Sequence, residues 1–226
     1  MSKRSKRYVE SRKNVDLEKK YELKEAVQLL KSFKPAKFVE SVEVAMKLGI
    51  DPKQSDQLVR GSISLPKGIG KSLKVIVFAA GEKATIAKKA GADEVGAEEL
   101  VKKVEGGWTD FDVAIAASDM MRLVGKLGRV LGPQGKMPSP KSGTVTDDIE
   151  TAVKEFKAGK IEYRTDAGGN VHTIVGKVTF SDKDLEDNIN TFVKHIINSR
   201  PASAKGVFVE KVSISSTMSP GIMLQV

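Results

Sequence analysis

The chain of 226 residues contains no cysteine. Disulfide scaffolds, thiol nucleophiles and zinc sites built on thiolates are therefore excluded, and the composition fits a reducing compartment. No apolar run reaches the roughly 18 residues that a membrane-spanning helix requires. The basic segment 1–7 is not followed by the apolar stretch of a secretory signal. We therefore predict a cytoplasmic protein with no membrane partner.

Aromatic residues are also scarce, at 5% of the chain, which argues against a surface that binds by stacking many bases. What the sequence has instead is positive charge, with 38 lysines and arginines against 29 aspartates and glutamates. The net charge of +9 favours a polyanionic partner. With 40% hydrophobic and 30% charged residues, we expect a folded chain of one large domain or two small ones.

The sequence offers no catalytic or metal-binding constellation. His172 and His195 are far apart, and no carboxylate stands at a metal-ligand spacing from both. The acidic pairs 98–99 and 147–148 begin expected helices, where negative side chains stabilise the helix dipole. We therefore expect no enzyme activity, no catalytic residue, no metal site and no cofactor.

The N-terminal third has mixed helix and strand patterns. Apolar residues between 23 and 30 have the spacing of an amphipathic helix, which should end near Phe33 because Pro35 follows. Apolar and polar residues then alternate over 42–48 and again over 59–65, which predicts two half-buried strands.

The C-terminal third also has mixed helix and strand patterns. We expect strands over 160–164, 171–180 and 206–216, with a long helix between the last two. The apolar phase slips between Val209 and Val212, and this slip predicts a β-bulge or a bend in the strand.

The middle of the chain differs from both ends. Residues 73–79 are nearly all apolar, which is typical of a strand buried on both faces. Expected helices cover about 82–90 and 97–104, a strand covers 111–116, and further helices start near Asp119, as the N-cap, and near Asp148, the second ending at Gly159. Short helices that alternate with strands favour parallel α/β packing.

We therefore predict a two-domain protein of mixed α/β and α+β class. A discontinuous α+β domain is formed by residues 1–67 and 160–226, and an α/β domain is inserted at 68–159. One continuous α/β domain remains the alternative. The two outer segments together hold 24 basic and 16 acidic side chains, against 14 and 13 in the insert. A polyanion-binding site should therefore be sought first on the terminal domain.

Residues 68–72, GIGKS, are similar to the end of a phosphate-binding loop. The full pattern requires a glycine where the chain has Leu65, and it requires a helix where a strand is expected. A turn between domains is the preferred interpretation. An α/β enzyme or regulator that binds a phosphorylated small molecule remains the alternative function.

A second glycine-rich segment, residues 125–143, contains basic side chains and no acid. As a nucleotide-binding loop it fails, because Val130 and Met137 occupy positions that require glycine and Ser/Thr. The segment is either a solvated loop or a surface that contacts an anion. Its cations, Lys126, Arg129, Lys136 and Lys141, are our candidates for a secondary contact with RNA or tRNA.

Two further segments combine side chains suited to RNA. Residues 213–221 cluster hydroxyls at a strand end, and hydroxyls can bond phosphates and ribose 2′-OH groups. Residues 37–43 bring a cation, an aromatic ring, a hydroxyl and carboxylates to a strand start. The alternatives are a plain turn for the first segment and a core position for Phe38.

Three stretches carry a family resemblance: Ala36–Gly61, Lys126–Pro138 and the pair Thr217-Met218. Through them the chain resembles, over nearly its whole length, the L-one family of large-subunit ribosomal proteins in its bacterial form. The resemblance implies an RNA-binding terminal α+β domain and an inserted Rossmann-like domain joined through a hinge. It implies a cytoplasmic protein of the ribosome, monomeric when free, that is not an enzyme.

The resemblance also implies partners. They are large-subunit ribosomal RNA, in the mobile stalk beside the tRNA exit site; exit-site tRNA, whose deacylated form the protein helps to release; and the protein's own mRNA, whose translation it represses. The implied RNA contacts are Lys37, Phe38, Ser41, Glu43, Thr217, Met218 and Ser219, with Arg164 as a weaker candidate.

Each implied contact has an expected physical role. Lys37 would meet a phosphate, and Phe38 would pack against a ribose or base. Ser41, Thr217 and Ser219 would bond sugar hydroxyls or base edges. Glu43 could accept from a 2′-OH or a guanine amino group, and Met218 could act through its backbone.

Overall fold

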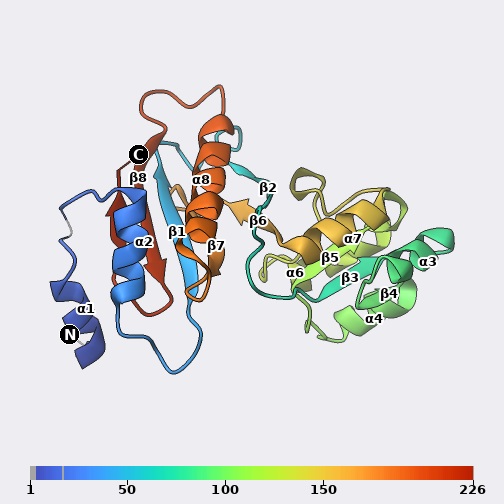
Figure 1. The fold of residues 1–226 in the computed structure, drawn as a ribbon. Helices are drawn as coiled ribbons and strands as arrows, with labels where there is room; N and C mark the ends of the chain where they lie inside the picture. The colour runs from blue at the N-terminus through green and yellow to red at the C-terminus, as the bar shows by residue number, and fades with distance from the viewer. Residues whose placement is uncertain (1–3, 17, 226) are drawn as a thin grey trace. The chain divides into compact units, whose positions relative to one another are not determined.

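A computed structural model describes residues 4–16 and 18–225. The chain divides into two compact units: residues 1–70 with 163–226, and residues 71–162. We call them the terminal unit and the inserted unit (Figure 1). The parallel and antiparallel sheets described below confirm the predicted mixed α/β and α+β class. Among the described residues, no helix is both long and apolar enough to cross a membrane.

The terminal unit is built on a four-stranded antiparallel sheet. Its strands are β1 (Ser41–Leu48), β7 (Asn170–Lys177), β8 (Val209–Ser216) and β9 (Ile222–Leu224), in the order β7-β1-β8-β9. Strand β1 alternates strictly between buried and half-buried positions, as its sequence predicts. Because β1 is central, it joins the C-terminal strands to the N-terminal part of the chain.

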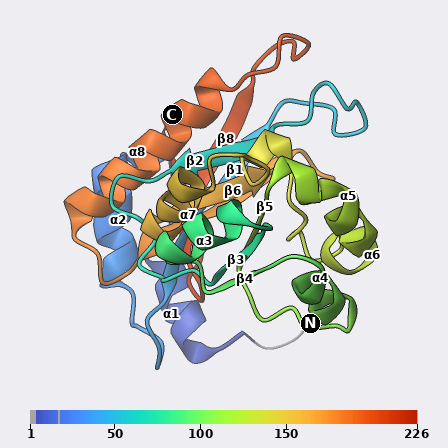
Figure 2. The same cartoon turned by 90° about the vertical axis from the view of Figure 1, so that its right-hand side faces the viewer.

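Two helices cover one face of this sheet. Helix α2 (Leu23–Ser32) packs on β8 and β9, and α8 (Asp182–Asn198) packs on β7 and on α2. Figures 1 and 2 show both helices on the same side of the sheet. Each buries the apolar stripe expected from its 3.6-residue period. The half-buried row of β1 lies on the opposite face of the sheet.

Helix α1 (Lys6–Lys13) was not expected from the sequence. Its periodicity is weak, and Ser11 is its one buried residue. The helix starts at a favourable N-cap, because the Ser5 hydroxyl accepts a hydrogen bond of 3.3 Å from the Tyr8 N–H. A favourable N-cap does not by itself predict a helix that lacks an apolar face.

The predicted bulge in β8 is confirmed. Lys47 pairs with Lys211 and the next residue, Leu48, pairs with Val209, so Glu210 is the extra residue. Two strand limits in this sheet were wrong. Strand β8 begins at Val209 and not at 206, since Gly206 has a φ of 75° that breaks the extended chain. Strand β7 ends at Lys177, where a turn begins whose Phe180 N–H bonds the Lys177 carbonyl.

A separate two-stranded sheet pairs β2 (Arg60–Ser64) with β6 (Lys160–Arg164). Both strands lie where their sequence patterns predict them. Strand β6 includes the point at which the chain passes from the inserted unit to the terminal unit, between Glu162 and Tyr163.

The inserted unit contains a parallel three-stranded sheet in the order β4-β3-β5. Its elements are β3 (Val75–Phe78), α3 (Glu82–Lys89), β4 (Glu94–Gly96), α4 (Glu98–Glu105), β5 (Val113–Ala116) and α7 (Ile149–Ala158). All four residues of β3 are buried, as its continuous apolar run predicts. The Asp148 carboxylate caps α7 by accepting from the Thr151 N–H at 3.2 Å.

The helix expected from Asp119 onward is broken into short pieces. They are η1 (Ser118–Met120), α5 (Met121–Val124), η2 (Gly125–Leu127) and α6 (Gly128–Leu131). The glycines at 125 and 128 disfavour a continuous α-helix, which explains the alternation with 3₁₀ turns. Asp119 is not the N-cap; its exposed carboxylate accepts a hydrogen bond of 3.0 Å from Lys83 Nζ.

Candidate RNA-binding interface

The first and last segments of the chain meet at Ser41 and Thr217. The Ser41 N–H donates to Thr217 Oγ1 at 3.0 Å, and the Thr217 N–H donates to the Ser41 carbonyl at 3.0 Å. Lys177 Nζ donates to Ser41 Oγ at 2.7 Å. We call this pair of backbone-anchored hydroxyl residues the Ser41–Thr217 clasp. It brings together two predicted RNA contacts that are 176 residues apart in sequence.

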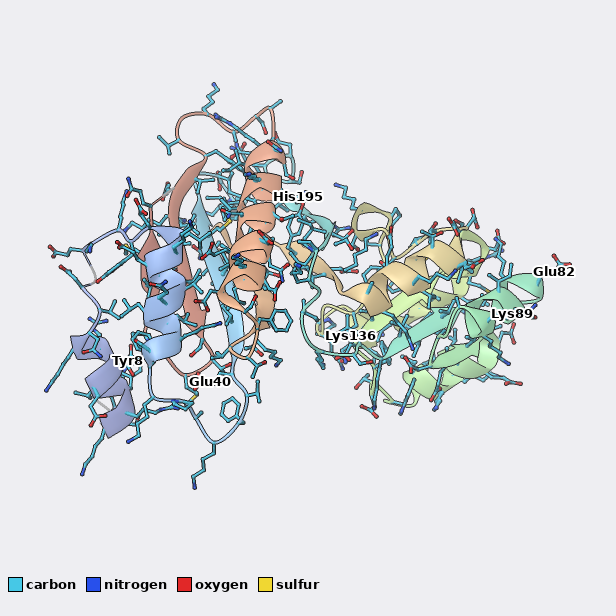
Figure 3. All side chains as sticks on the ribbon, viewed as in Figure 1. Tyr8, Glu40, Glu82, Lys89, Lys136 and His195 are labelled. Carbon is cyan, nitrogen blue, oxygen red and sulfur yellow. The ribbon has the colours of Figure 1, made fainter. Side chains whose placement is uncertain are left out.

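Glu40 organises the loops around this clasp. Its Oε2 accepts from Ser216 Oγ at 2.5 Å and from the Met218 N–H at 3.1 Å. Its Oε1 accepts from the Ala36 N–H at 2.9 Å and from Arg7 Nη1 at 3.3 Å. Figure 3 shows Glu40 at the base of α2, near α1. One buried carboxylate thus ties the clasp's two segments and α1 together.

The charge of Glu40 is favoured despite its burial, at 6% exposure. Burial alone would raise the pKa of Glu40, but hydrogen bonds from Ser216, Met218 and Ala36, and the charge of Arg7, outweigh it and lower the pKa. The sequence alone did not single out this residue. The signal was present, because position 40 is in phase with the buried row 42, 44, 46 and 48 of β1.

A tight turn follows β8. The Ser219 N–H bonds the Ser216 carbonyl at 3.1 Å, and the Ser216 N–H bonds Ser219 Oγ at 2.8 Å. The Ser219 hydroxyl also donates to the Pro220 carbonyl at 3.0 Å. The Ser219 side chain is therefore half-buried and engaged within its own turn. The turn presents Thr217 and Met218 to solvent.

Three other predicted contacts lie near the clasp. Lys37 and Phe38 are in the exposed loop before β1, and Phe38 is 54% exposed. Glu43 lies on β1 two residues after Ser41, on the same face of the sheet, opposite Ser215. The half-buried row of β1 therefore places the Glu43 carboxylate beside the clasp, with Ser215 opposite it on β8.

Arg164 is exposed on β6, which belongs to the separate two-stranded sheet. It is thus not part of the sheet that carries the clasp. The sequence pattern does not show which sheet β6 joins, because sheet membership depends on pairing with strands that are distant in the chain.

The cationic segment 125–141 lies in the inserted unit and is not a simple loop, since it is helical as far as Leu131. Lys126, Arg129 and Lys141 are exposed. Lys136 is half-buried: its Nζ donates to the Thr109 carbonyl at 2.9 Å and lies 5.0 Å from the centre of the Phe111 ring. Lys136 therefore supports the fold of this unit, while the other three cations face solvent.

The remaining motifs serve the fold. His195 Nε2 and the Tyr163 hydroxyl share a hydrogen bond of 2.8 Å, and burial lowers the pKa of His195. Gly68 and Gly70 adopt positive φ angles, and residues 68–72 lead into strand β3. Within the described part of the chain, no three histidine or acidic side chains gather into a metal-binding group.

Comparison with known proteins identifies relatives of the chain. A model of the ribosomal protein L1p/L10e family matches residues 30–220. The chain is 55% identical over 224 residues to the large ribosomal subunit protein uL1 of Kosmotoga olearia, covering 99% of this chain and 97% of the relative. It is 53% identical over 224 residues to uL1 of Protochlamydia amoebophila, covering 99% and 95%.

These matches confirm the resemblance carried by the three sequence stretches. They also confirm the expectation of a non-enzymatic protein, because the family consists of ribosomal proteins. The chain belongs to the ribosomal protein L1p/L10e family.

Proposed function

We propose that the protein binds large-subunit ribosomal RNA through the terminal unit, at the surface around the Ser41–Thr217 clasp. The observation that carries this proposal is the clasp itself, which fixes hydroxyls and backbone from both ends of the chain in one place. Lys37, Phe38 and Met218 stand exposed beside it. The relatives' names, which describe large-subunit ribosomal proteins, support the choice of RNA.

Binding energy at this surface divides into two kinds. Lys37 meets a phosphate, and this contribution weakens as salt rises because counterions are released. The hydroxyl of Thr217 and the carboxylate of Glu43 bond ribose hydroxyls or base edges, and this contribution is much less sensitive to salt. A specific complex therefore keeps a preference for its RNA at salt concentrations that abolish non-specific binding.

We also propose the finer functions that the family resemblance implies. The protein forms the mobile stalk near the tRNA exit site, assists release of deacylated tRNA and represses translation of its own mRNA. The exposed cations Lys126, Arg129 and Lys141 form the secondary contact with RNA or tRNA. We propose that the chain is monomeric when free and acts in the cytoplasm, on the ribosome.

A binding assay tests the main proposal. Purified bacterial large-subunit RNA, an unrelated structured RNA of equal length and a set of nucleotides are titrated with the protein at two salt concentrations. We expect tight binding to the first RNA, a preference over the second that persists at the higher salt, and no tight binding of nucleotides. Tight nucleotide binding without RNA binding would favour the small-molecule alternative.

A further inference from the structure

The terminal unit contains a cavity of about 300 Å³ beside the Ser41–Thr217 clasp. Its inner wall is formed by Leu30 of α2 and by Phe33, which are buried. Phe38, Val39 and Met218 also line it, and they are exposed. Cavities of this size are at the lower end of those that hold small ligands.

The mouth of the cavity is apolar. Phe38, Val39 and Met218 are 54%, 56% and 52% exposed, although they are large hydrophobic side chains. Exposed apolar side chains that gather at one place mark a binding surface more often than isolated ones do. Phe38 and Met218 are also among the residues proposed to contact RNA, so the cavity opens within that surface.

The charge around the mouth is positive. Lys34 lines the cavity, Lys37 is in the same loop, and neither forms an ion pair within the described residues. The carboxylate in the lining is that of Glu40, and its two oxygens already accept four hydrogen bonds. The cavity therefore suits a group that is largely apolar and is attached to a negative charge.

We propose that this cavity receives one unstacked nucleobase of the bound ribosomal RNA. The inference rests on the proposed RNA-binding function of the same surface. The base lies against the Phe38 ring and the Met218 thioether, and the adjoining phosphate lies near Lys34 and Lys37. Bases in RNA junctions and loops are already free to leave the stack, so insertion there costs little.

The inference is tested with a variant whose new side chain fills the cavity from its rim. Val39→Trp adds a large side chain at a position that is 56% exposed, so the core is not overpacked. Val207→Trp is the matched control, since Val207 is 72% exposed in the same unit and does not line the cavity. Stacking of one base on an aromatic side chain corresponds to roughly a 5- to 150-fold change in affinity.

We expect Val39→Trp to weaken binding of bacterial large-subunit RNA within that range, while Val207→Trp and the melting temperatures of both variants stay as in the unaltered protein. Base-specific chemical probing gives the second readout. The unaltered protein should protect the Watson–Crick edge of one unpaired base, and Val39→Trp should leave that base reactive while the rest of the footprint persists.

Three results overturn the inference. Unchanged affinity of Val39→Trp shows that the cavity is not used. A second contrary result is weaker binding of Val39→Trp with the same protected bases as the unaltered protein. It shows that the tryptophan obstructs the surface without displacing a base, and that the cavity holds a different, apolar occupant or none. Failure of the unaltered protein to bind this RNA overturns both the inference and the proposed function, whereas the first two results leave the proposed function intact.

Discussion

The carboxylate of Glu40 and the backbone N–H of Met218, which are 178 residues apart in the chain, are joined by a hydrogen bond of 3.1 Å. Glu40 precedes β1, and Met218 follows β8, the strand paired with β1. The bond therefore fixes the turn after β8 relative to the loop before β1. The shape of the proposed RNA-binding surface depends on this buried acid as well as on its exposed side chains.

Glu40→Gln should destabilise the protein by about 1–3 kcal/mol. In the variant, an amide group with only one acceptor oxygen replaces the two carboxylate oxygens that accept these hydrogen bonds in the unaltered protein. Chemical denaturation at pH 7 measures the change. Glu210→Gln is the control, since Glu210 is an exposed acid at the bulge of the same sheet, and its loss should change stability by no more than about 0.5 kcal/mol. Equal stabilities of the two variants would show that the Glu40 bonds contribute nothing.

The contribution of Glu40 should depend on pH. Its pKa in the folded protein lies below the ordinary value of 4.5, so its stabilising effect is present above that value and is lost as pH falls through the folded pKa. The stability difference between the unaltered protein and Glu40→Gln should therefore narrow between pH 7 and about pH 3. A difference that stays constant over this range would contradict the lowered pKa.

Thr217→Ala should weaken binding of large-subunit RNA by about 1–3 kcal/mol and leave the melting temperature nearly unchanged. The hydroxyl of Thr217 accepts from the Ser41 N–H, yet the residue is exposed, so water can replace this bond in the free protein. Thr217→Ser keeps the hydroxyl and should retain binding. Wild-type affinity in Thr217→Ala would remove this hydroxyl from the contact surface.

Joining Gly70 to Tyr163 through a short glycine linker, with residues 71–162 deleted, should leave a folded protein that binds the RNA. The expectation follows because the sheet β7-β1-β8-β9 and its two helices lie wholly in the terminal unit. Circular dichroism and RNA titration test it. A deletion variant that folds but does not bind would assign the RNA contact to the inserted unit.

Regular hydrophobic patterns in the sequence predicted most of the fold. The alternation in β1 and the apolar run of β3 each predicted a strand, because burial on one or both faces leaves a direct trace in the sequence. The bulge at Glu210 was visible for the same reason, as a shift of apolar phase. Helix α1 left no such trace, since it buries so little.

Local rules failed where glycine and long-range contacts decide the outcome. The apolar spacing between 119 and 131 indicates one helix, but two glycines break it into short turns. Glu40 was overlooked because an acid is normally exposed, and its distant partners come from two segments, at Arg7 and at residues 216–218. The clasp itself required the pairing of β1 with β8, which composition and spacing do not specify.

Crosslinking to large-subunit RNA tests the central claim most directly. Photoreactive groups placed at Lys37, next to the clasp, and at Arg129, in the inserted unit, report separately on the two surfaces. We expect strong crosslinks from position 37 to one short region of the RNA, lost when unlabelled RNA competes. Crosslinks from position 129 alone, with none from position 37, would contradict the assignment of RNA binding to the terminal unit.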